Sequence, residues 1–277
     1  MITLLGLFNG LLTGLFDIVF WPFRALDPIW AMVFVSLVTG VLMVWMFGKM
    51  SDQRSVKRVK DRIRGNLIAV RLYQNDIRVV FRLQGRILRD TLTYMKYSVI
   101  PMLVMMVPVV LIMIQLNLRF SVRPLQEGRQ TLVIAKVRDA SVLNDTIVLK
   151  SSEGVAIETS GVRIKSEREI AWRIRAEKPG QYSLVVETGN ESVEKNLIVG
   201  EGWGSVSALR TGNNLLDVVL YPGEKPIKSS SPVESIEIKY QALSMPVFGW
   251  NIHWLVLFFV LSIVFGFALK GPLGVEV

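Results

Sequence analysis

The chain contains no cysteine and only one histidine, His253, among its 277 residues. Without thiols there can be no disulfide bond, no zinc site with cysteine ligands and no cysteine nucleophile. A Ser-His-Asp hydrolase or a histidine-ligated metal centre would have to be built around His253 alone. We therefore expect a protein that is not an enzyme and that holds no metal and no cofactor.

Charged side chains are also absent from three long stretches, Ile29–Phe47, Tyr97–Leu118 and Ile252–Leu269. The hydrocarbon core of a bilayer is about 30 Å thick and needs about 20 helical residues to cross it. The overall composition agrees, with 51% hydrophobic residues and a mean hydropathy of +0.41. The sequence predicts three transmembrane helices, at residues 26–48, 97–118 and 249–270.

The basic residues gather between the first two predicted spans. Residues 49–96 carry 13 Lys and Arg and 4 acidic residues, a difference equal to the net charge of +9 of the whole chain. Short loops rich in Lys and Arg stay in the cytoplasm. This places 49–96 and the tail 271–277 in the cytoplasm and 119–248 outside. Nucleic-acid binding would use the same charges, but this segment has few aromatic residues, so we expect no specific nucleic-acid partner.

Within 49–96, apolar residues recur at alternating steps of three and four, which is typical of a coiled coil or a helical hairpin. The seam is predicted at positions 56, 59, 63, 66, 70, 73, 77, 80, 84, 87 and 91. Gln74, Asn75 and Asp76 favour a turn and a helix N-cap. The basic residues of the first arm are Arg54, Lys57, Arg58, Lys60, Arg62 and Arg64. Anionic lipid, a ribosome or another polyanionic partner would all contact these charges, and the sequence leaves them open.

Residues 1–25 contain a long apolar stretch in which Asp17 is the one charge before Arg24. A signal peptide needs a basic start and a small-residue cleavage site, and neither is present. Thr3, Gly6, Gly10, Thr13 and Asp17 share one helical face, which favours an amphipathic helix in the membrane interface over a fourth span. Gly6, Gly10 and Gly14 form a ridge that could pack against another helix.

The hydrophobic pattern of residues 119–248 has a period of two, and turn signals divide it into short strands. The predicted strands are Thr131–Val137, Ala171–Arg175, Gln181–Glu187, Val193–Val199, Leu215–Leu220 and Ile236–Tyr240. A hairpin is expected across residues 188–191. This pattern predicts an extracytoplasmic all-β sandwich of immunoglobulin-like type. It contains no catalytic pattern, so we expect partner binding or bracing of the spans.

Few polar residues interrupt the spans. Ser36 and Thr39 lie in the first, Gln115 and Asn117 late in the second, and Ser262 in the third. Polar groups at membrane depth face protein or a water-filled cavity, although Ser and Thr can also bond to carbonyls of their own helix. Gly40 would allow another helix to approach closely. Pro101 and Pro108 should kink the second span. The spans carry no deep charge, which argues against an ion-coupled transporter.

This order of elements resembles the YidC/Oxa/Alb superfamily of membrane protein insertases. The three-span form is similar to its archaeal homologues and to the insertase subunit of the endoplasmic reticulum membrane complex. The similarity covers roughly residues 16–119 and the final span. Val38-Thr39-Gly40 followed by Lys49-Met50-Ser51 looks like the family's passage from span to hairpin, and 101–108 like its proline-bracketed span. Thr39 stands where bacterial members carry an arginine, and the proline spacing looks one residue longer.

The resemblance implies an integral protein of a prokaryotic plasma membrane that inserts nascent or unfolded membrane proteins. Ser36, Thr39, Gly40, Gln115 and Asn117 would line a hydrated groove that is open to lipid and carries polar client segments across the bilayer. Other membrane subunits and the ribosome would be further partners. The alternative is a membrane-anchored structural or adaptor subunit whose outside β domain binds an envelope partner.

Overall fold

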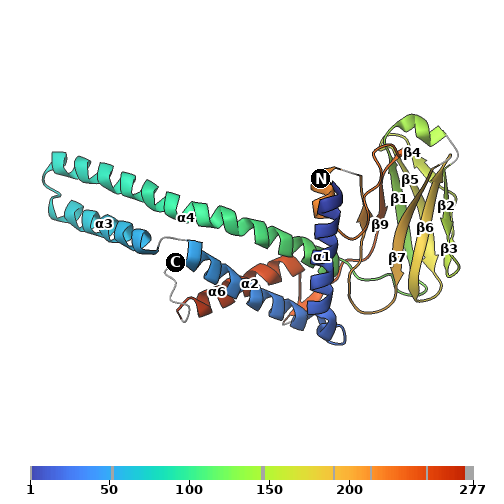
Figure 1. Ribbon diagram of the computed structural model, residues 1–277, viewed down its shortest axis with the longest axis horizontal. Coiled ribbons are helices and arrows are strands. Elements are labelled where there is room, and N and C mark those ends of the chain that lie inside the picture. The colour runs from blue at the N-terminus through green and yellow to red at the C-terminus, as the bar shows by residue number, and fades with distance from the viewer. Residues whose placement is uncertain are drawn as a thin grey trace. The chain divides into compact units, whose positions relative to one another are not determined.

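The computed structural model describes residues 2–50, 53–144, 147–189, 191–212, 214–247 and 249–271 (Figure 1). The chain divides into two compact units. The first, which we call the β unit, comprises residues 1–31 and 112–254. The second, the helical unit, comprises residues 32–111 and 255–277.

Among the described residues, three helical segments are long and apolar enough to cross a membrane, namely Gly6–Phe23, α2 (Pro28–Met50) and α4 (Ile77–Phe120). Two of the three predicted spans therefore coincide with span-length helices. The third, α6 (Trp254–Leu269), has 16 residues, or about 24 Å of helix at about 1.5 Å per residue. Residues 250–252 at its predicted start form strand β11 instead. Of the tail 271–277, only Gly271 lies within the described residues.

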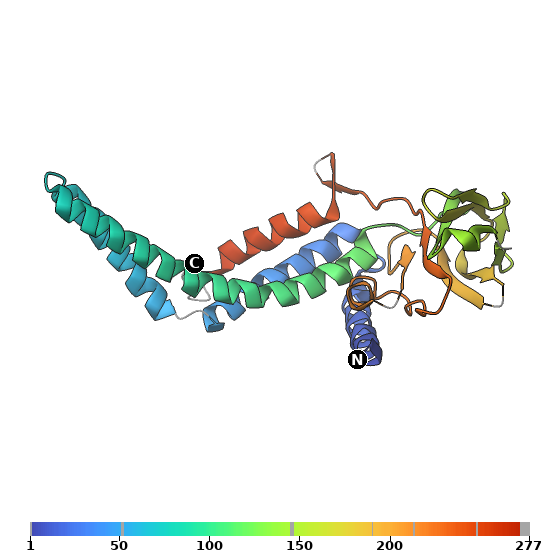
Figure 2. The same cartoon turned by 90° about the horizontal axis from the view of Figure 1, so that it is seen from above.

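Helix α4 joins the second arm of the predicted hairpin and the second predicted span into one helix of 44 residues. Pro101 and Pro108 lie inside it without ending it. Proline lacks the N–H that would bond four residues back, and its ring crowds that carbonyl, so bending is expected there. Figure 2 shows that α4 is not straight.

Helix α3 (Gln53–Leu72) lies beside the first half of α4 in both views (Figures 1 and 2). The predicted turn is confirmed, because Asp76 Oδ1 accepts hydrogen bonds from Arg78 N at 3.0 Å and Val79 N at 3.2 Å. The predicted seam is buried or half-buried on α3 at positions 56, 59, 63, 66 and 70. The prediction is wrong at positions 73, 77 and 84, which are exposed, and Leu83 is buried in place of position 84. The turn resets the helical phase, so the alternation cannot be continued across it.

Replacing Asp76 with alanine removes this N-cap and leaves two amide groups of α4 without their acceptor. We expect the first turn of α4 to lose about 1 kcal/mol of local stability. Amide hydrogen exchange should show faster exchange at residues 77–80 with little change in the second half of α4. Asp61→Ala, at an exposed position of α3, is the control. Equal effects of the two substitutions would contradict the capping role.

The β unit begins with helix α1 (Ile2–Phe20) and the short 3-10 helix Trp21–Phe23. Its strands form three antiparallel sheets, of six, three and two strands. The largest has the order β3-β5-β1-β9-β8, with β4 also paired to β5. These strands are Val155–Ile157, Glu169–Ala176, Gln130–Val137, Val233–Ile238, Leu209–Arg210 and Val162–Ile164. The second sheet is β2 (Ile147–Ser151), β6 (Gly180–Thr188) and β7 (Glu191–Val199), and the third is β10 (Met245–Val247) with β11 (Trp250–Ile252).

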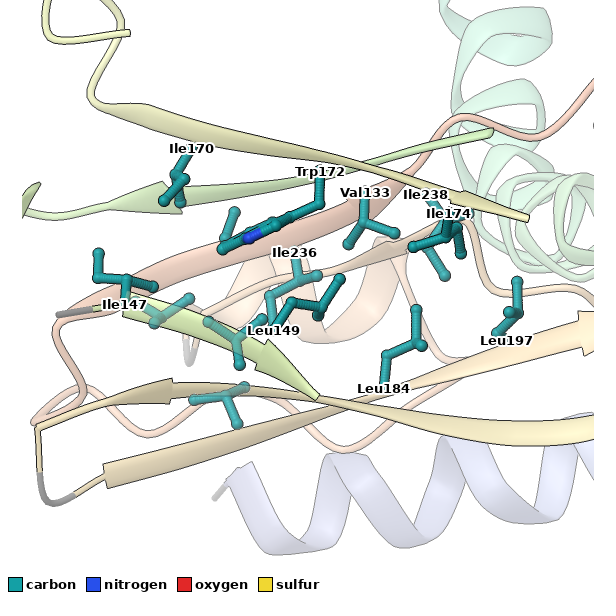
Figure 3. Close-up of a cluster of buried hydrophobic side chains, with 14 of the residues drawn as sticks. Val133, Ile147, Leu149, Ile170, Trp172, Ile174, Leu184, Leu197, Ile236 and Ile238 are labelled. Atoms are coloured by element: carbon teal, nitrogen blue, oxygen red, sulfur yellow. The ribbon is translucent and has the colours of Figure 1, made fainter. Parts of the chain in front are cut away.

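The six-stranded and three-stranded sheets share one hydrophobic core (Figure 3). Trp172 and Ile174 from β5 and Leu184 from β6 are among its fully or nearly fully buried members. Burial alternates along β1 from Gln130 to Val137, as a strand with one buried face requires. The predicted strands at 131–137, 171–175, 181–187 and 193–199 are confirmed, and the predicted strand at 236–240 overlaps β9, which ends at Ile238.

The predicted strand Leu215–Leu220 is wrong, because these residues form helix α5. Asn214 determines the difference, since its side chain accepts a hydrogen bond from Leu216 N at 3.0 Å and so starts a helix. The predicted β6–β7 hairpin is confirmed by the pairing of Thr188 with Glu191. Gly189 has a φ of +58°, which suits a tight hairpin turn. Asn190 lies outside the described residues.

Candidate functional site

In the helical unit, α2 and α6 approach each other closely at Gly40. A Cβ atom at this position would lie 2.9 Å from the carbonyl oxygen of Ser262 and 3.1 Å from the amide nitrogen of Gly266. Only glycine leaves room for backbones this close. The sequence-based expectation that Gly40 permits close helix approach is thus confirmed.

Replacing Gly40 with alanine should force α2 and α6 apart, because backbone atoms cannot yield as a flexible side chain would. We expect a loss of about 1–3 kcal/mol in the free energy of unfolding. Gly65 on α3 is a matched control, since a Cβ atom added there would have nothing within 4 Å. Gly65→Ala should gain up to about 1 kcal/mol from helix propensity. Thermal unfolding of the detergent-solubilised chain measures both, and equal shifts would contradict the tight contact.

A cavity of about 250 Å³ lies beside this contact, between α2, α4 and α6. Most of its lining is apolar, and the residues are Thr39, Gly40, Met43, Val44, Val109, Phe258, Phe259, Ser262, Ile263, Gly266, Phe267 and Lys270. Thr39 donates its hydroxyl to the Val35 carbonyl at 2.7 Å, within its own helix. The Ser262 hydroxyl is buried and has no hydrogen-bond partner among the described residues. Ser36 is fully buried, and its hydroxyl likewise has no hydrogen-bond partner among the described residues.

The structure therefore brings Thr39, Gly40 and Ser262 together around one cavity. Ser262 is a polar residue of the last predicted span but is not among the groove residues that the sequence predicts. Of the other three predicted groove residues, Ser36 does not line this cavity, and Gln115 and Asn117 belong to the β unit. Asn117 lines a small cavity of about 50 Å³ there.

Gln115 is part of a buried polar cluster around Arg119, a residue that the sequence analysis did not single out. One guanidinium nitrogen of Arg119, Nη1, donates to the Gln115 carbonyl at 3.0 Å and to Gln115 Oε1 at 2.8 Å. The other, Nη2, donates to the Thr13 carbonyl at 3.0 Å and to Asp17 Oδ1 at 2.6 Å. Gln115 Nε2 also donates to Thr13 Oγ1 at 3.2 Å. This cluster fastens α1 to the last turns of α4.

The aromatic rings of Phe16 and Phe20 complete the surroundings of Arg119, each 5.7 Å from the guanidinium carbon. Phe20 also meets Phe120, whose ring stacks on Trp203 at 5.0 Å. A sequence signal for the ion pair existed, because Asp17 and Arg119 are isolated opposite charges beside apolar segments. Their pairing could not be predicted, since 102 positions separate them.

The polar face predicted for α1 contacts protein at Thr13 and Asp17, whereas Gly6 and Gly10 are exposed and the Asp17 side chain remains 40% exposed. Asn9 donates to the Val218 carbonyl of α5 at 2.6 Å, and Thr13 and Asp17 contact the Arg119 cluster. Leucine and isoleucine side chains elsewhere on α1 are exposed, namely Leu7, Leu11, Leu15 and Ile18. No described atom lies within 4 Å of a Cβ built on Gly6, Gly10 or Gly14. The glycine ridge thus has no packing partner in the described part of the chain.

The β unit contains a second buried ion pair. Lys195 on β7 donates to Glu224 Oε1 and to the Ser207 carbonyl, the latter at 2.6 Å. The side chains are 0% and 5% exposed. Burial lowers the pKa of Lys195 even though the Glu224 carboxylate opposes this shift. Burial likewise raises the pKa of Tyr240, whose hydroxyl accepts a hydrogen bond from Ile198 N at 3.1 Å.

The described residues contain no group of three or more His, Cys, Asp or Glu that could hold a metal. The buried ion pair of Lys195 and Glu224 connects β7 to the loop that follows α5.

Several predicted basic residues of α3 interact within the arm. Arg58 donates to Ser55 Oγ at 2.9 Å, and Lys60 lies 5.8 Å from the ring centroid of Tyr94. Arg62 lies 4.0 Å from Asp90, which also accepts a hydrogen bond from Asn66. Lys57 and Arg64 are exposed, and the side chain of Arg54 lies outside those described. The α3 cations thus contribute to the hairpin as well as to its surface charge.

Models of known protein families provide no match to this chain, and a comparison with curated proteins likewise finds none.

Proposed function

We propose that this chain is a membrane protein insertase or chaperone, which receives a polar segment of a client protein in the cavity between α2, α4 and α6. The supporting observation is the Ser262 hydroxyl, which is buried without a partner among the described residues, beside Thr39 and Gly40. A backbone group without a partner in hydrocarbon costs several kcal/mol. A hydroxyl at this depth can bond to the client backbone or hold a water that does so.

The proposal includes the membrane topology. The basic arm lies in the cytoplasm of a prokaryotic cell, and the β unit forms an immunoglobulin-like sandwich on the other side. Helix α1 lies in the interface plane, which is supported by its exposed leucines and by the contacts of Thr13 and Asp17 with protein. The short helix α6 favours local thinning of the bilayer, because a segment shorter than the hydrocarbon core is accommodated in this way. A thinner bilayer lowers the barrier for a polar segment, and no covalent chemistry is required.

A crosslinking experiment tests the cavity as the client site. A photoreactive residue is placed at Thr39, which lines the cavity, and at Trp45, which is 49% exposed on the same helix. Stalled nascent membrane proteins should crosslink to position 39 in preference to position 45. A Ser262→Ala variant should reduce the crosslink at position 39. Equal labelling of positions 39 and 45 would count against a groove.

One observation favours the alternative, a membrane-anchored adaptor that acts through its β unit. Gln115, which was predicted to line the groove, instead binds Arg119 and Thr13 and so stabilises the β unit. Its side chain is therefore not available to a client. An adaptor needs a stably folded β unit, because this unit would contact the outside partner.

Deleting residues 126–240 separates the two functions. The ends of the deletion lie close together, since Arg123 N bonds to the Gln241 carbonyl at 3.0 Å and Val122 pairs with Ala242, so a short linker can join them. In reconstituted vesicles, an insertase core should retain some insertion of a client without the deleted part. Complete loss of function, with the shortened chain still folded in the membrane, would support the adaptor.

A further inference from the structure

The arm-forming half of α4 carries an exposed apolar stripe that does not face α3. It consists of Ile77, Phe81, Leu88, Leu92 and Met95, which are 70%, 69%, 63%, 59% and 51% exposed. At about 100° per residue, these five positions and Gly85 all point within about 40° of one direction. The residues buried against the hairpin seam, Leu83 and Asp90, lie on another side of the helix.

A row of cations accompanies the stripe. In the sequence, each of these cations comes directly after a residue of the stripe or after Gly85, and all of them are exposed. They are Arg78, Arg82, Arg86, Arg89 and Lys96. The single acidic residue of α4, Asp90, is 4% exposed and contacts Asn66 in the hairpin. The surface therefore combines an apolar strip with a positively charged border, which is the composition of a helix that lies on an anionic membrane.

The stripe continues without a break into the span-forming part of α4. Val99, Met102 and Met106 are exposed and point in the same direction as Leu88. In the span this face can contact lipid. A partner protein bound to the arm alone would not account for this continuity, whereas a bilayer that contacts both segments does.

Pro101 is buried and lies about 160° around the helix from the stripe. A proline ring pushes the preceding turn open on its own side, so a helix bends away from its proline. The bend therefore inclines the arm toward the side that carries the stripe.

From these observations, we propose that the stripe and its row of cations dock on the anionic lipid surface of the bilayer from which the arm emerges. The apolar side chains enter the boundary between headgroups and acyl chains, while the guanidinium groups contact lipid phosphates. The arm then lies against the membrane and does not project from it. This docking goes beyond client insertion and would hold for an adaptor as well.

Single-cysteine labelling tests the docking, because the chain has no native cysteine. Gly85→Cys places an environment-sensitive fluorophore in the stripe, and Gly65→Cys places it at an exposed position of α3. Both glycines have nothing within 4 Å of an added Cβ, so neither label disturbs packing. The full chain is reconstituted in nanodiscs of phosphatidylcholine alone or with phosphatidylglycerol, each with nitroxide-labelled lipid as quencher.

We expect the label at position 85 to be quenched in the anionic nanodiscs at least about twofold more than the label at position 65. Combining R78Q, R82Q and R86Q should lower the docked fraction about tenfold or more, since each cation near an anionic surface contributes separately. These three side chains are exposed, unlike the residues of the hairpin seam. Equal quenching at both positions, or quenching independent of phosphatidylglycerol, would overturn the proposal. A response at position 85 only upon addition of an apolar helical peptide would also overturn it and assign the stripe to a protein partner.

Discussion

Replacing Asp17 with alanine is expected to free α1 from the end of α4 at a cost of about 3 kcal/mol. The Arg119 side chain is 2% exposed, and among the described residues Asp17 supplies the one carboxylate that contacts it, at 2.6 Å. Without Asp17, the guanidinium keeps its bonds to the Thr13 and Gln115 carbonyls but stays buried without a counter-charge. Hydrogen exchange of the α1 amides measures the opening free energy of the helix.

Two further variants distinguish the ion pair from a general effect of lost charge. Asp61→Ala removes an exposed carboxylate from α3 and should leave exchange in α1 unchanged. The double variant Asp17→Leu with Arg119→Met replaces the pair by apolar groups and should recover most of the loss, because neither charge is left buried alone. If the double variant were as unstable as Asp17→Ala, packing rather than electrostatics would fasten α1.

The largest effect expected within the sheets follows from Glu224→Ala. Among the described residues, this substitution leaves the fully buried Lys195 ammonium only the Ser207 groups as acceptors, which should cost about 3–5 kcal/mol. The surface pair of Lys150 and Glu187, 2.7 Å apart and 61% and 39% exposed, is the control within the same unit. Glu187→Ala should cost less than about 1 kcal/mol. Thermal unfolding of the whole chain in detergent compares them, and similar losses would contradict the importance of burial.

The ion pair of Lys195 and Glu224 makes the stability of the folded chain depend on pH. The pKa of Lys195 is lowered in the folded chain from 10.5, so between the lowered pKa and 10.5 the unfolded chain binds more protons. The contribution of Lys195 to the free energy of unfolding should therefore rise with pH in that interval and stay constant below it. Tyr240 acts in the opposite sense, because its raised pKa makes stability fall as pH increases above 10. Below about pH 10, the free energy of unfolding should reflect Lys195 and not Tyr240. Its increase with pH should be absent from a variant that combines Lys195→Met with Glu224→Leu.

The sequence predicted local features wherever a short segment contains its own signal. Alternation of apolar residues identified the long strands of the β unit, and the turn at residues 74–76 was correct because Asp76 bonds to amides only two and three positions away. Gly40 was correctly interpreted because a glycine within an apolar helix is otherwise costly. Leu215–Leu220 was misassigned because an apolar run of six suits a strand or a helix, and the single hydrogen bond from Leu216 to Asn214 decides between them.

The membrane-length apolar helices, the basic helical hairpin and the β-rich segment follow from the sequence alone, because length, charge and periodicity are properties of contiguous residues. Which polar side chains share a site depends on the fold. The fold pairs Asp17 with Arg119 and Lys195 with Glu224. It also places Gln115 in the polar cluster around Arg119 and Ser262 beside Thr39 at the cavity. Such partners lie tens to hundreds of positions apart in the sequence. They come together on folding because burying a polar group without a hydrogen-bond partner costs free energy.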